Sequence, residues 1–78
     1  MRILDNGSNR PLEEVTLYLT RAEAAQLAGY LQDMLTSGEH HSHLNDDEYA
    51  RQMTVAIYTD ENLNEFDERS RRLIAEGL

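Results

Sequence analysis

The 78-residue sequence predicts a small α+β fold built from two strand-strand-helix halves. A phrase with alternating apolar residues, Val15–Thr20, recurs forty positions later as Val55–Asp60. Alternation of large apolar residues with small or hydroxylated ones is typical of a strand with one buried face. Each copy ends in a residue type that commonly begins a helix. We therefore expect one domain with halves at 1–38 and 39–78, forming a small, largely antiparallel four-stranded sheet with two helices on one face.

The first half is expected to contain two paired strands and a helix. Residues 2–5 form a short extended segment, and Asn6–Pro11 includes an Asn-Gly pair that favours chain reversal. Leu12–Leu19 would then return as the antiparallel second strand. Thr20-Arg21-Ala22-Glu23 matches a capping box, in which the Thr and Glu side chains accept hydrogen bonds from each other's backbone N–H groups. The helix should begin there and end at Ser37-Gly38, because glycine favours the conformation that terminates helices.

The second half is less regular in sequence. One interpretation makes residues 40–44 a strand, 45–48 a turn and 49–59 the antiparallel partner strand. The alternative is a plain loop after the first helix. We favour the strand interpretation because it repeats the order of the first half. The last helix should begin between Asp60 and Asp67, and its buried side would carry Phe66, Leu73 and Ile74.

Composition limits the possible partners. Fifteen Asp and Glu residues against seven Arg, with no Lys, give a formal net charge of -8. This charge opposes binding to nucleic acid and to anionic lipid, so we expect neither partner. The absence of Cys excludes a disulfide framework, a zinc finger and a thiol nucleophile. No apolar run matches a membrane span or a signal peptide, and we expect a cytoplasmic protein without a cofactor.

Tyrosines mark the predicted interaction surface. Alternation would place Thr16, Tyr18, Thr54 and Tyr58 on the sheet face opposite the helices. Tyrosine combines a large apolar body with one polar tip and is enriched at protein interfaces. A chain of this length buries only roughly 60 to 65% of its unfolded surface, and small domains often gain further burial by oligomerising. We therefore expect a non-catalytic protein-binding module that forms a homodimer; a small-molecule site at the tyrosines is the less favoured alternative.

Carboxylates support a second function hypothesis. Asp46-Asp47-Glu48 and Asp60-Glu61 lack the spaced oxygen ligands of a calcium loop, and their placement suits turns and helix starts. We include Asp47 and Glu61 among the residues expected to contact a partner. An acidic surface also suits an inhibitor or immunity-type protein that covers a basic enzyme site, because complementary charge speeds association.

A histidine pair is the candidate metal site. His41 and His43 are two residues apart, so on a strand they would share one face. Both imidazoles would then reach one zinc, copper or nickel ion, with an acidic residue of the following turn as third ligand. Because this ligand set is incomplete, we favour a solvated surface. A small enzyme based on His41, His43 and Tyr58 is the remaining alternative, and no phosphate loop or nucleophile elbow supports catalysis.

Overall fold

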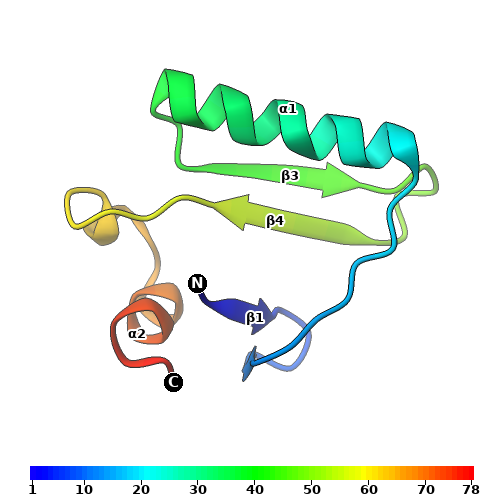
Figure 1. Cartoon of the computed structure of the whole chain (residues 1–78). Helices are drawn as coiled ribbons and strands as arrows, with labels where there is room; N and C mark the ends of the chain where they lie inside the picture. Colours follow the sequence, from blue (N-terminus) through cyan, green and yellow to red (C-terminus); the bar gives the residue numbers. More distant parts are fainter. The chain divides into compact units, whose positions relative to one another are not determined.

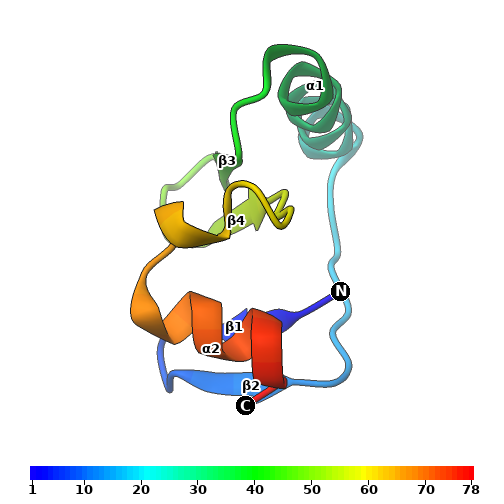
Figure 2. The same ribbon diagram turned by 90° about the vertical axis from the view of Figure 1, so that its left-hand side faces the viewer.

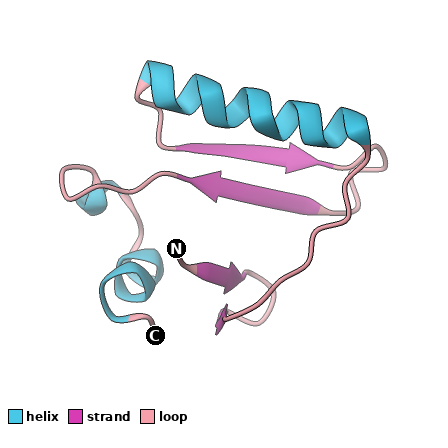
Figure 3. Cartoon of the chain, viewed as in Figure 1, coloured by secondary structure: helices cyan, strands magenta, loops and turns pink.

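The computed structural model describes residues 1–78 and has the predicted α+β class (Figures 1 and 3). In chain order the elements are β1 (Ile3–Asp5), β2 (Arg10–Leu12), α1 (Arg21–Ser37), β3 (His41–Asn45), β4 (Gln52–Ala56), the 3-10 helix η1 (Leu63–Glu65) and α2 (Glu68–Glu76). The chain forms two compact units: residues 1–17 with 59–78, and residues 18–58. Neither helix has both the length and the apolar composition needed to cross a membrane.

The strands form two separate antiparallel pairs, β1 with β2 and β3 with β4. The prediction of a single four-stranded sheet with both helices on one face is therefore wrong. The second strand is the element that differs, because β2 occupies Arg10–Leu12 rather than Leu12–Leu19. Its partner β1 is only three residues long, so the ladder ends where Leu12 pairs with Ile3. Beyond Leu12 the chain continues as a loop up to α1 (Figure 3).

Both ends of α1 lie where the sequence predicts. The Thr20 hydroxyl accepts a hydrogen bond from the Glu23 N–H at 3.1 Å, and the Glu23 carboxylate accepts one from the Thr20 N–H at 2.9 Å. These two bonds complete the capping box. At the other end Gly38 has a φ of 81°, in the left-handed region that favours glycine, and its N–H donates to the Met34 carbonyl at 3.2 Å.

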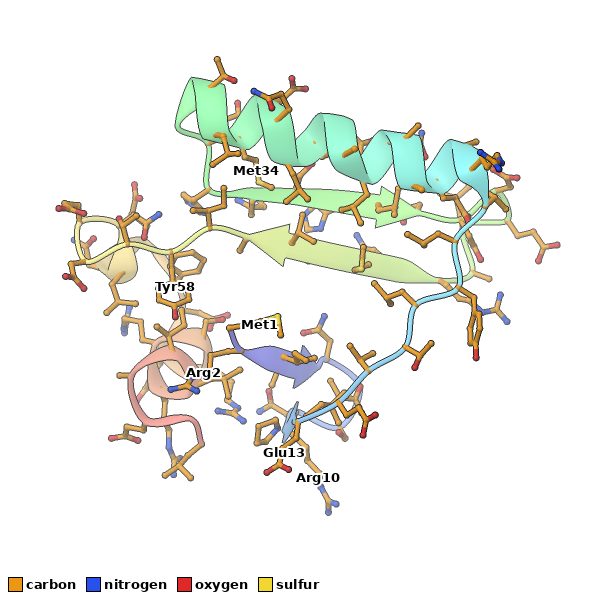
Figure 4. All side chains as sticks on the ribbon, in the orientation of Figure 1. Met1, Arg2, Arg10, Glu13, Met34 and Tyr58 are labelled. Carbon is orange, nitrogen blue, oxygen red and sulfur yellow. The ribbon has the colours of Figure 1, made fainter.

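In the unit formed by residues 18–58, α1 packs on β3 (Figures 1 and 2). Met34 of α1 and Leu44 of β3 are 4% and 6% exposed and are the buried apolar residues of this unit. Figure 4 shows the Met34 side chain extending from α1 toward the strands. On β4, Met53 and Val55 are half-buried, and they alternate with exposed residues. The helix therefore packs on β3, the buried and half-buried residues lie on one face of the β3–β4 pair, and the other face is exposed.

In the other unit, an aspartate organises the β1–β2 turn. The Asp5 carboxylate accepts hydrogen bonds from the Gly7 N–H at 3.0 Å and from the Ser8 hydroxyl at 2.7 Å. These bonds lower the pKa of Asp5, with the Ser8 hydroxyl as the largest cause. Asn9 has a positive φ of 62° and donates its N–H to the Asp5 carbonyl at 2.7 Å. The predicted chain reversal is confirmed.

Helix α2 begins at Glu68, one residue beyond the predicted window, and its cap is the last residue of that window. Its N-cap is Asp67, whose carboxylate accepts a hydrogen bond from the Ser70 N–H at 2.7 Å. Leu73 is buried on its inner side. The Arg69 guanidinium donates to the Asn9 carbonyl at 3.0 and 3.3 Å, which connects α2 to the β1–β2 turn of the same unit.

Candidate functional site

The candidate site is the face of the β3–β4 pair opposite α1, which we call the open face. Three cross-strand pairs make it up: His41 with Ala56, His43 with Thr54, and Asn45 with Gln52. All six residues are exposed, whereas the residues between them on each strand are buried or half-buried. The face extends along the whole paired length of both strands, and it contains no carboxylate.

Histidine rings dominate one end of the open face. His41 and His43 share one face, as the two-residue spacing predicts, and their ring centroids lie 5.4 Å apart in an edge-to-face arrangement. His40 lies next to them, with its Nδ1 3.3 Å from the Nδ1 of His41. On the opposite strand the Thr54 hydroxyl lies 2.8 Å from the His43 Nδ1. This hydrogen bond joins the two strands across the middle of the face and orients the His43 ring.

The candidate metal ligand set is only partly assembled. His41 and His43 share a face, but no group of three or more His, Asp or Glu side chains is arranged to hold a metal ion. Asp46, one candidate for the third ligand, has its carboxylate bonded within the β3–β4 turn. Zinc sites in proteins have three or four protein ligands, so the imidazole pair alone falls short of such a site.

Asp46 shapes the turn that joins β3 to β4. Its carboxylate accepts hydrogen bonds from the Arg51 N–H at 3.2 Å and the Ala50 N–H at 2.8 Å, and pairs with the Arg51 guanidinium at 3.3 Å. The Arg51 N–H is the largest cause that lowers the pKa of this carboxyl below its usual value. Tyr49 takes a positive φ of 54° within the turn. Asp47, which we expected to contact a partner, is exposed at the tip of the turn.

The predicted tyrosine surface is not assembled within one sheet. Tyr18 is 92% exposed, and it lies with Thr16 in the loop before α1 rather than on a strand. Tyr58 is 43% exposed and follows the end of β4 (Figure 4). Placing Thr16 and Tyr18 on the same sheet face as Thr54 is therefore wrong, because Val15–Leu19 makes no strand pairing. Their part in a partner interface stays a prediction, as does that of Glu61, which is exposed beyond β4.

Two open-face residues were missed by the sequence interpretation. Asn45 was assigned to the turn, yet it is the last residue of β3 and faces Gln52 across the strands. Extending the alternation of His41 and His43 by two more residues would have identified Asn45. Gln52 follows in the same way from Thr54.

The loop before α1 contains an unusual apolar segment. Val15–Thr20 carries no charge in a chain with 28% charged residues, and its apolar members alternate with polar ones. Val15 and Leu17 are each 50% exposed, and Leu19 is 39% exposed. No backbone hydrogen bond connects Val15–Leu19 to the rest of the chain. A segment with strand patterning thus lies exposed without a strand partner.

Comparison of the chain with models of known families, with curated proteins and with solved structures finds no match. Function therefore has to be inferred from the chemistry of the site. The open face offers imidazole, amide and hydroxyl groups on a regular, exposed surface. Such groups can both donate and accept hydrogen bonds.

Proposed function

We propose that the protein is a non-catalytic protein-binding module that self-associates through the β3–β4 pair. The observation that carries this proposal is the exposure of one complete face, with all six of its residues accessible. An isolated two-stranded hairpin is marginally stable in water, and a third strand or a packed surface stabilises it. Here α1 supplies such packing on one face only. A second protein surface on the open face would supply packing on the other side of the β3–β4 pair.

Charge also favours this face as the contact between copies. Each chain has a formal net charge of -8, so two copies repel each other in most relative orientations. The open face carries no carboxylate, and its central pair is His43 with Thr54. A twofold axis would bring this same surface of both copies together, as an isologous dimer interface requires.

A near-isosteric charge substitution tests the proposal. Gln52→Glu adds one negative charge to the open face of each copy, whereas Gln26→Glu adds the same charge to an exposed position of α1. We expect Gln52→Glu to raise the dimer dissociation constant roughly tenfold, because each copy would bring a carboxylate into a contact that otherwise has none. Gln26→Glu should change it little. Sedimentation velocity over a concentration series measures both constants, and an equal effect of the two variants would argue against the face.

A second candidate function rests on the exposed carboxylates. Asp47 and Glu48 are accessible at the β3–β4 turn, and Asp60 and Glu61 are accessible after β4. An acidic inhibitor or immunity-type protein would use such groups to approach a basic enzyme site, since complementary potentials steer association. The dependence of its association rate on salt tests this alternative.

A further inference from the structure

We propose that the outer edge of β4 binds the Val15–Thr20 segment of a second copy of this chain, which adds to the sheet as a third strand. This inference rests on the proposed self-association and adds a backbone contact at the edge of the β3–β4 pair, beside the open face. Strand addition to a sheet edge is a common mode of protein recognition, in which backbone hydrogen bonds supply affinity and alternate side chains supply specificity.

Backbone register identifies the groups available at this edge. The Ile57 N–H donates to the His40 carbonyl at 2.8 Å, and the Asp46 N–H donates to the Arg51 carbonyl at 3.1 Å. Hydrogen-bonded and non-hydrogen-bonded pairs alternate along antiparallel strands. Every second residue of β4 therefore directs its N–H and C=O away from β3, namely Gln52, Thr54 and Ala56. No strand pairs with β4 on that side.

The sequence of this edge lacks the usual protection against strand addition. Edge strands commonly carry charged residues or proline, which discourage pairing with another chain. Gln52–Thr59 contains neither a charge nor a proline. Val15–Thr20 shares both properties and has the period-two pattern of a strand. Each copy therefore has one unprotected edge and one unpaired strand-like segment.

Charge identifies a second copy as the occupant. Two chains of net charge -8 approach most favourably where neither presents a carboxylate, and both segments meet that condition. Because each copy carries both an edge and a segment, two copies can exchange segments about a twofold axis. Such a reciprocal exchange closes the assembly at a dimer rather than an open chain.

Side-chain alternation fits the added strand. If Val15, Leu17 and Leu19 lie on the α1 side of the sheet, they continue the apolar row formed by Met53 and Val55. These residues are 39 to 50% exposed, and their apolar surface would then be covered. The alternate residues of the segment would extend the open face of the partner: Thr16, Tyr18 and Thr20. The tyrosine surface would thus be assembled between copies.

Proline substitutions in the segment test the inference. Successive residues of a strand direct their N–H groups to opposite sides, so either Thr16 or Leu17 would donate to β4. Thr16→Pro and Leu17→Pro together therefore test both possible directions of the added strand. Neither substitution removes a hydrogen bond that the monomer makes. At least one should weaken the dimer about tenfold or more, because a twofold dimer loses two backbone hydrogen bonds. The control Glu14→Pro lies in the same loop outside the segment, and because it also removes one negative charge from each copy, it should not weaken the dimer.

The receiving edge is tested by Ala56→Pro and by hydrogen exchange. Ala56→Pro removes an outward N–H and should weaken the dimer to a similar extent. In the wild-type chain, the Ala56 amide and alternate amides of Val15–Leu19 should become protected as protein concentration rises through the dimerisation range. A dimer in which these amides stay unprotected would overturn strand addition and leave the open face as the contact. Protection independent of concentration would overturn it in favour of pairing within one chain, and a monomer at all concentrations would overturn the proposed self-association as well.

Discussion

The Asp46 carboxylate binds both the backbone N–H of Arg51, at 3.2 Å, and the Arg51 guanidinium, at 3.3 Å. A third hydrogen bond, from the Ala50 N–H at 2.8 Å, completes the turn between β3 and β4. This turn fixes the strand register, and the register sets which side chains form the open face. The residues proposed to contact a partner therefore depend on a carboxylate that itself faces into the turn.

Protonation of Asp46 should destabilise the fold at low pH. Its hydrogen bonds lower the pKa in the folded state below the ordinary value of 3.8. A group of this kind contributes fully above its unfolded pKa, and the contribution is lost as pH falls through the folded pKa. Urea unfolding between pH 7 and about pH 2 should show a smaller acid-induced loss of unfolding free energy in Asp46→Asn than in wild type. Asp47→Asn is the matched control, and identical pH dependence in all three proteins would contradict the role of Asp46.

The capping box should contribute measurably to stability. Thr20→Ala removes the hydroxyl that accepts from the Glu23 N–H, so we expect the free energy of unfolding to fall by about 1 kcal/mol. Thr16→Ala, at an exposed loop position, should stay within about 0.5 kcal/mol of wild type. Urea denaturation followed by circular dichroism compares the two variants. An equal loss of unfolding free energy in Thr20→Ala and Thr16→Ala would show that the capping box does not stabilise the fold.

Zinc should not bind the isolated chain tightly. Although His41 and His43 share a face, no group of three or more His, Asp or Glu side chains is arranged to hold a metal ion, and two imidazoles leave the metal mostly hydrated. Isothermal calorimetry of wild type should give no heat above background. A saturable heat that disappears in His41→Ala would establish a metal site and contradict this expectation.

The salt dependence of association distinguishes an acidic inhibitor from a self-associating binding module. If exposed carboxylates steer the protein to a basic partner, association should slow steeply as ionic strength rises. Asp47→Asn with Glu61→Gln should then lower the on-rate more than it raises the off-rate, because exposed charges guide the encounter. Stopped-flow association with a partner captured from lysate measures both rates. An on-rate that changes neither with salt nor with the two substitutions would exclude the acidic-surface mechanism.

Local signals in the sequence predict local structure well in this chain. Thr20 and Glu23 meet as a capping box, Gly38 ends α1, and the Asn6–Pro11 stretch reverses the chain. Each of these features depends on residues within a few positions of one another, so short-range hydrogen bonding decides the outcome. The alternation of His41 and His43 likewise placed both rings on one face of β3.

Long-range pairing could not be derived in the same way. Val15–Leu19 and Val55–Ile57 have similar patterns, but only the second contributes to a strand, because β3 is aligned beside it. The first follows a hairpin whose short β1 offers it no partner. A period-two pattern indicates a strand-compatible segment without specifying the strand it will pair with. For that reason the alternation predicts the shared face of His41 and His43 but not the position of Tyr18.

Molar mass in solution tests self-association most directly. Light scattering coupled to size-exclusion chromatography at micromolar concentration should give twice the 9.0 kDa mass of one chain. Tyr18→Glu and Tyr58→Glu should each return the mass to that of one chain, while circular dichroism still shows helix. A wild-type mass of one chain at every concentration, unchanged in both variants, would contradict the proposed self-association.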